Sequence, residues 1–271
     1  MGKSRSRLKA RTKAILKTKK RKTNSVKNKA KAKNKEKNKQ QSKATNSSGI
    51  NLKKIIPNII AILLIPIAVN LTMSLVKQIS NINQLSEVQV YFLAGIVAYM
   101  AFDSILYRPM YLYVLGHELT HVLASWLCGA KVTSFKVSSQ GGEAGSTKSN
   151  FFISLSPYFI PLYTLLLCLS FYLTQLFYEP IAEYQTQFIF LIGATWSFHL
   201  VLTAHFLKTK QPDFTKWGYL FSVVLVYIVN IIILSLPLAW IFDQVVLKQF
   251  FLTAFDTTKD FYLEVYRQLF L

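Results

Sequence analysis

Residues 114–130 read VLGHELTHVLASWLCGA, where two histidines, a glutamate and a threonine interrupt an otherwise apolar segment. The segment extends over 109–128, and about 20 residues is the length that an α-helix needs to cross the hydrocarbon core of a membrane. Polar groups inside such a helix are costly unless they face a cavity, a metal ion or one another. The stretch therefore predicts a membrane-embedded helix whose polar residues have a specific role.

Apolar runs of similar length recur on either side of this one. They cover 55–76, 90–107, 151–176, 186–207 and 217–242. Aromatic residues gather at the ends of several runs, as they do where membrane helices meet the interface. The sequence therefore predicts an all-α polytopic membrane protein with about five to six transmembrane or re-entrant helices.

The charges of the connecting loops predict an orientation. The loop KTKQPDFTK at 208–216 is basic and is expected in the cytoplasm, whereas YEPIAEY at 178–184 is acidic and is expected outside. Six full crossings from a cytoplasmic N-terminus would place the basic loop outside. We therefore expect that one run before residue 150 does not cross. The run 90–107, which ends near Asp103 and Arg108, is the candidate for a re-entrant or interfacial piece.

The N-terminal segment 1–54 differs in composition from the rest of the chain. It contains 21 Lys or Arg residues, one acid (Glu36) and no aromatic residue, so that it carries the whole formal net charge of +20. Such a segment cannot bury enough apolar surface to offset the entropy of ordering it, and it resists translocation. We predict a disordered cytoplasmic tail that contacts anionic lipid headgroups. Nucleic acid is the alternative partner, although no groove-reading motif is present.

The remaining chain is expected to divide into two parts. Residues 55–242 form a membrane-embedded domain, and 243–271, which mixes charged and aromatic residues, has the pattern of an amphipathic helix at an interface. Between the third and fourth apolar runs, KVTSFKV at 131–137 alternates imperfectly and is followed by several glycines. This pattern predicts a short β element after the helix that carries the histidines.

The sequence HELTH at 117–121 has the spacing of a zinc site. Residues four apart lie on one face of an α-helix, so that His117 and His121 can bind one ion with Glu118 beside them. In this HExxH arrangement, two imidazoles bind zinc and the carboxylate acts as general base towards a water molecule. We therefore predict Zn²⁺ as cofactor, His117 and His121 as ligands, and Glu118 as the catalytic base.

A third protein ligand must come from elsewhere, because VLASWL after His121 has neither the glycine nor the third histidine of a metzincin. Asp213 opens the last span on the expected cytoplasmic side, and His121 lies near the same end of its helix, so the two can meet. His199 lies deeper in a span and is either a supporting or a packing histidine. His205 lies near a span end, and Glu143 lies in the glycine-rich loop. We predict Asp213 as the third ligand, with His199 and Glu143 as the alternatives.

With HELTH inside an apolar helix, a glycine-bearing segment after it and an aspartate opening a later span, the chain resembles the site-2 protease family of intramembrane zinc metalloproteases. The resemblance covers about 109–235. It implies that 55–242 is a metalloprotease-like domain in which both histidines and the aspartate bind zinc, the glutamate is the base, and membrane-spanning proteins are substrates. Asp213 stands in QPDFT rather than in an Asn-Pro motif followed by Leu-Asp-Gly, which indicates a divergent member.

Two other interpretations remain open at this point. A non-catalytic membrane scaffold would bind zinc without cleaving peptides. A membrane-tethered binder would act through the basic tail, with binding that weakens as salt rises. All three interpretations predict an integral protein of the cell membrane with a cytoplasmic N-terminus.

Overall fold

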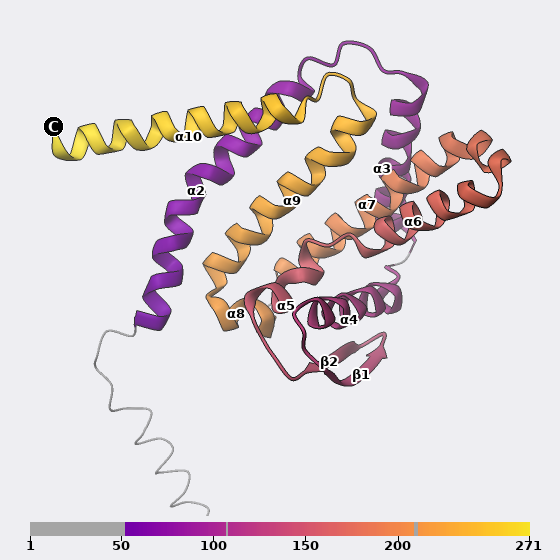
Figure 1. Cartoon of the computed structure of the whole chain (residues 1–271), viewed down its shortest axis with the longest axis horizontal. Helices are drawn as coiled ribbons and strands as arrows, with labels where there is room; N and C mark the ends of the chain where they lie inside the picture. Colours follow the sequence, from indigo (N-terminus) through magenta and orange to yellow (C-terminus); the bar gives the residue numbers. More distant parts are fainter. Residues whose placement is uncertain (1–51, 107, 209–210) are drawn as a thin grey trace, which may run out of the picture. The chain divides into compact units, whose positions relative to one another are not determined.

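The computed structural model describes residues 52–106, 108–208 and 211–271, and Lys53–Leu271 form one compact unit. The tail predicted over 1–54 therefore lies outside the described residues, except at its last three positions. Helices make up most of the described chain, and its strands form one small two-stranded sheet (Figure 1).

Four helices in the described part of the chain are long and apolar enough to cross a membrane, and a fifth is added if a sharply bent pair counts as one span. The four are α2 (Leu52–Ile79), α3 (Glu87–Ile105), α7 (Gln185–Leu207) with the 3-10 helix η2 (Glu179–Tyr184) before it, and α9 (Tyr219–Ile241). The expected helical chain with several membrane-length helices is confirmed, and the four to five candidate spans lie at the lower end of the predicted five to six. The run 109–128 forms α4 (Met110–Leu127), which is not one of the four, because HELTH lowers its mean hydropathy.

Most of the run 90–107, which is expected to be re-entrant or interfacial, lies in the continuous helix α3. This helix is long and apolar enough to cross a membrane, so its shape does not support the expectation, which stays a prediction. The helix begins at a capping box in which the backbone N–H of Ser86 donates to Gln89 Oε1 at 3.0 Å. It then packs along α7, where a Cβ on Gly95 or on Gly193 would collide with the backbone of the other helix. Small residues at such a contact let two helices approach closely along their length.

The break in an apolar run lies instead within 151–176. Here α5 (Phe151–Leu155) and the 3-10 helix η1 (Ser156–Tyr158) are followed by α6 (Leu162–Phe177), at an angle of 76°. Pro161 stands immediately before α6 and has no backbone N–H to continue the first helical piece. The bend gives a broken span or a re-entrant segment.

The predicted β element after α4 is confirmed. It is an antiparallel hairpin of β1 (Val132–Ser138) and β2 (Gly141–Ser146), in which Val137 pairs with Gly142. The second strand lies against α4, and a Cβ on Gly142 would be only 2.5 Å from Cγ of Glu118. The hairpin thus lies directly beside the HELTH turn of the helix.

Two further helices complete the fold. The short helix α8 (Pro212–Trp217) leads into α9 through Gly218, whose φ of +97° favours a residue without a side chain. The helix predicted within 243–271 is present as α10 (Leu247–Phe270). It contacts α2, where Asn70 Nδ2 donates a hydrogen bond of 3.1 Å to Thr258 Oγ1.

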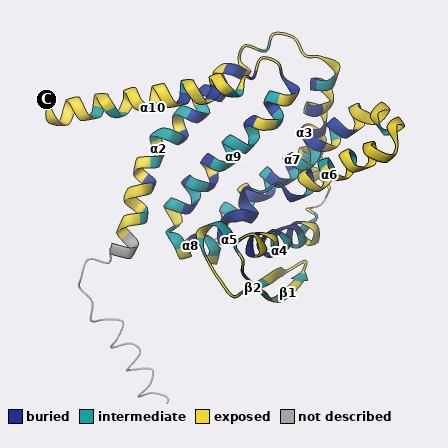
Figure 2. Ribbon diagram, viewed as in Figure 1, coloured by how far each residue is buried: buried dark blue, intermediate teal, exposed yellow. Residues whose placement is uncertain are grey.

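Three apolar clusters hold these elements together. The largest joins α2, α3, α7, α9 and α10, the second surrounds Tyr158 and Phe214, and the third joins α4 to α7 through Tyr113 and Leu202. Figure 2 shows buried residues along α4 and α7, whereas most of α6 and of the C-terminal part of α10 is exposed. Large apolar side chains are exposed along α2 and α6, which suits helices that face lipid.

Candidate metal centre

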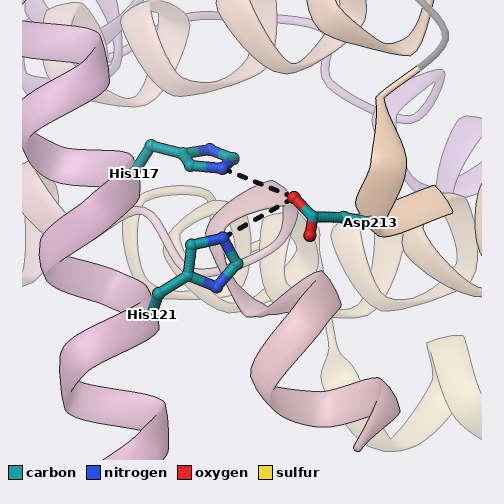
Figure 3. Close-up of side chains that lie close together, drawn as sticks. All are labelled: His117, His121 and Asp213. Atoms are coloured by element: carbon teal, nitrogen blue, oxygen red, sulfur yellow. Dashed lines mark ion pairs between the residues drawn. The ribbon is translucent and has the colours of Figure 1, made fainter. Parts of the chain in front are cut away.

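His117 and His121 lie one turn apart on α4, with ring centroids 4.8 Å from each other. The carboxylate of Asp213, carried by α8, lies opposite both rings (Figure 3). Its Oδ2 is 3.8 Å from Nε2 of His117 and 3.6 Å from Nε2 of His121. One ligand atom of each residue lies within 4.8 Å of the other two, so the group can hold a metal ion.

The position of Asp213 is fixed by the packing of α8. The next residue, Phe214, is fully buried and packs on Tyr158 with ring centroids 4.3 Å apart. Its carbonyl accepts a hydrogen bond of 3.1 Å from Ser222 Oγ of α9. Pro212 occupies the first turn of α8, where a missing N–H costs nothing and the fixed φ suits a helix. The carboxylate therefore extends from a short, well-anchored helix.

The two imidazoles are oriented through their Nδ1 atoms. Nδ1 of His121 lies 2.7 Å from the carbonyl oxygen of Ile153, which can only accept a hydrogen bond. Nδ1 of this ring therefore carries a proton, and Nε2 is the atom that faces Asp213 and that would bind a metal ion. Nδ1 of His117 lies 3.4 Å from the hydroxyl of Tyr113. Contacts of this kind commonly fix the tautomer and direction of metal-binding histidines.

The Asp213 carboxylate is kept in its charged form. Burial favours a higher pKa for this carboxyl, but the attraction of the two neighbouring histidines outweighs burial and holds the pKa below its usual range. The hydroxyl of Tyr158 also donates to Oδ2 at 3.2 Å. An ionised carboxylate is the form that binds a metal ion.

Glu118 lies beside the metal-binding group without belonging to it. Its side chain is 7% exposed, and its carboxylate accepts a hydrogen bond from the backbone N–H of Ala144 in β2. Burial raises the pKa of Glu118, and this effect outweighs the opposite influence of His121. A carboxylate whose proton affinity is raised is better suited to accept a proton.

A cavity of about 490 Å³ opens onto both the three possible ligands and Glu118. Its walls come from α4, β2, the segment before α5, and α8. The proposed base and the metal-binding group therefore face the same space, which is open to a molecule from outside.

The alternative third ligands lie elsewhere. Glu143 lines the cavity from β2 but is exposed and outside the metal-binding group. His199 is buried in α7, and Nδ1 of His205 lies 3.0 Å from Nη1 of Arg108. In the described part of the chain, the residue brought to the two histidines is Asp213.

Three contacts of the site were missed in the sequence: the Tyr158 hydroxyl, the Tyr113 hydroxyl and the Ile153 carbonyl. Tyr113 lies four residues before His117, so helical spacing contained a signal for it. Ile153 lies in α5 and Tyr158 in η1, far from the HELTH turn in sequence, and no local pattern marks either residue.

Comparisons with protein-family models, with curated proteins and with solved structures give no match to this chain. Its function must therefore be inferred from its own residues.

Proposed function

We propose that this chain is an intramembrane zinc metalloprotease, a divergent member of the site-2 protease family, that hydrolyses peptide bonds of membrane-spanning proteins. The observation that carries the proposal is the convergence of His117, His121 and Asp213 beside Glu118 on one cavity. The helices of membrane length in the same compact unit support a substrate that lies in the membrane.

The donor set fits zinc. Two imidazole nitrogens and one carboxylate oxygen leave one position of a tetrahedron for water or substrate, as in catalytic zinc sites. Zinc–ligand bonds of about 2.0–2.1 Å place neighbouring ligand atoms about 3.4 Å apart in a tetrahedron. The distances of 3.6 and 3.8 Å from Asp213 Oδ2 to the two histidines are close to this value, and all three ligand atoms lie within 4.8 Å of one another, so the side chains would have to move closer to bind one ion.

Each residue then has a distinct part in hydrolysis. Bound zinc supplies a Lewis acid and lowers the pKa of water towards neutrality. Glu118 takes the proton of the attacking water and passes it to the leaving amine. Tyr113 and Ile153 hold the two imidazoles, and Tyr158 holds the aspartate.

The hairpin supplies a way to hold the substrate. A helical peptide hides its carbonyl groups in its own hydrogen bonds, so it must be locally extended before attack. In the described chain the sheet contains only β1 and β2, which leaves one edge of β1 without a partner strand. An extended substrate can add to this edge as a further strand.

Metal analysis and a cleavage assay on the purified full chain test the proposal. Wild type is expected to hold about one zinc ion per chain, and His117→Ala and Asp213→Ala are expected to lose it. Glu118→Gln should keep zinc but lose cleavage of a membrane-spanning peptide. Wild-type protein that holds zinc without cleaving any peptide would instead indicate a metal-binding scaffold. Zinc retained in Asp213→Ala but not in His117→Ala would refute the third ligand alone.

A further inference from the structure

Two cavities meet at the proposed catalytic glutamate. The larger, of about 490 Å³, extends past His121 and Asp213, and the smaller, of about 220 Å³, extends past Tyr113 and Phe206. Both are lined by Glu118, together with its neighbours His117 and Gly142. The two cavities therefore adjoin at Glu118, and an extended peptide bound over this residue can reach both of them.

The larger cavity contains two ammonium groups with neutral partners. Lys216 Nζ donates to Ser149 Oγ at 2.5 Å, and Lys148 Nζ donates to the carbonyl of Cys128 at 3.3 Å. Among the described residues, the ion pairs of the fold involve neither lysine. Both lysines line the larger cavity, and the hydrogen bond to Ser149 connects Lys216 to the segment that carries Lys148, so the two residues form a basic part of the cavity wall.

The carboxylates of the larger cavity do not neutralise this wall. Asp213 pairs with the two histidines, and Glu118 accepts a hydrogen bond from the hairpin. Glu143 accepts a hydrogen bond of 3.5 Å from Ser134 Oγ, and among the described residues it forms no ion pair with either lysine. Lys148 and Lys216 are therefore free to attract a carboxylate that enters the cavity with a substrate.

The smaller cavity has a different character. One part of its wall is apolar and aromatic, with Met110, Val114 and the stacked rings of Tyr113 and Phe206, whose centroids lie 4.4 Å apart. The rest includes the neutral amides of Gln140 and Gln211. Glu118 is its only carboxylate, and no lysine or arginine lines it among the described residues. A large apolar side chain can bury its surface here, whereas a charged one would lose its hydration without a partner.

We propose that the chain selects the junction between an apolar run and an acidic flank of its substrate. A large apolar side chain enters the smaller cavity, and a carboxylate on the other side of the scissile bond binds at Lys148 and Lys216. This inference rests on the proposed function and adds the substrate class. It places the cut at an end of the substrate's membrane segment, because that is where an apolar run meets charged residues. A basic flank is repelled by the same wall.

Membrane-spanning peptides of one parent sequence, given to the zinc-loaded full chain in detergent, test the proposal. The flank of the apolar run carries Glu, Gln or Lys, and the last residue of the run is Leu or Ala. Mass spectrometry should locate the cut at the junction of the Glu peptide. Replacing Glu by Gln should lower kcat/KM by about threefold to tenfold, the range of one or two exposed ion pairs. Lys in the flank should lower it further.

Variants of the chain separate the two cavities. The double variant Lys148→Gln, Lys216→Gln should cleave the Glu and Gln peptides equally, whereas Lys259→Gln on α10, which lines neither cavity, should keep the preference for Glu. Met110→Trp, which fills part of the smaller cavity, should remove the preference for Leu over Ala.

The outcomes distinguish this inference from the proposed function. Cuts inside the apolar run whatever the flank, an unchanged preference for Glu in the double variant, or an unchanged preference for Leu in Met110→Trp would overturn the inference. Wild-type protein that cleaves no peptide, or cleavage that survives Glu118→Gln, would overturn the proposed function and the inference with it.

Discussion

The hydroxyl of Tyr158 donates a hydrogen bond of 3.2 Å to Oδ2 of Asp213, the same oxygen that faces His121. Tyr158 is fully buried, and its backbone carbonyl accepts a hydrogen bond of 2.8 Å from Asn230 Nδ2 on α9. Its backbone is thus tied to α9, and its side chain is tied to the metal-binding group. Tyr158 therefore directs the carboxylate towards the histidines.

Tyr158→Phe removes this hydrogen bond and keeps the ring. Loss of a partner that orients a metal ligand commonly weakens metal binding about 10- to 100-fold, and we expect a loss of this size for zinc. Competition with a chelating indicator measures the affinity, and excess zinc should restore peptide cleavage. Tyr172→Phe, on the exposed face of α6, is the matched control. Unchanged zinc affinity with lost cleavage at saturating zinc would show that Tyr158 acts on the substrate instead.

The local part of the site is contained in the sequence. His117, Glu118 and His121 lie within about one turn of a helix. Helical periodicity therefore fixes their relative positions without knowledge of the rest of the fold. The prediction that Asp213 lies near this turn depends on a weaker argument, namely that Asp213 and His121 both stand near helix ends on the same side of the membrane. It succeeded because α8 stands directly before a span.

The tertiary part of the fold was not contained in local patterns. Loop charges predict that 90–107 does not cross a membrane, but they contain no information on its partner, and the glycine pair Gly95 and Gly193 packs α3 closely against α7. The bend before Pro161 follows from one missing N–H in a run that otherwise looks like a single span. Tyr158 contacts Asp213 across 55 residues of sequence, and neither hydropathy nor periodicity predicts this contact.

The close contact of α3 and α7 predicts a strong effect of adding side chains there. In Gly95→Val the new side chain would meet the backbone of Phe190, which cannot rotate away as a side chain can. Overpacking of this kind costs about 1–3 kcal/mol, so the variant should unfold at a clearly lower temperature in detergent. Ala101→Val, at an exposed position of the same helix, is the control and should unfold like wild type. Equal unfolding temperatures for all three proteins would contradict the close contact.

Metal removal should destabilise the chain, because the ion would join α4 to α8. A ligand present at 100 times its dissociation constant stabilises the folded state by about 2.7 kcal/mol. We therefore expect a chelator to lower the unfolding temperature of wild type, and added zinc to restore it. His121→Ala should unfold at the same temperature with or without chelator. His205→Ala, whose histidine lies outside the group, should keep the wild-type response. If the chelator did not change the unfolding temperature of wild type, this would contradict a metal ion that links α4 to α8.

A substitution at Gly142 should displace the carboxylate of Glu118, the proposed base, and leave the metal ligands in place. A Cβ on this residue would lie 2.5 Å from Cγ and 2.8 Å from Oε1 of Glu118, so Gly142→Ala must displace the carboxylate. Since a misplaced catalytic group loses rate steeply, we expect cleavage to fall about 100-fold with zinc content unchanged. Gly145→Ala is the matched control in the same strand, because its new methyl group meets the hydroxyls of Thr133 and Ser134 instead. Equal rates for the two variants would show that the hairpin does not constrain Glu118, and loss of zinc in Gly142→Ala would show that it supports the ligands as well.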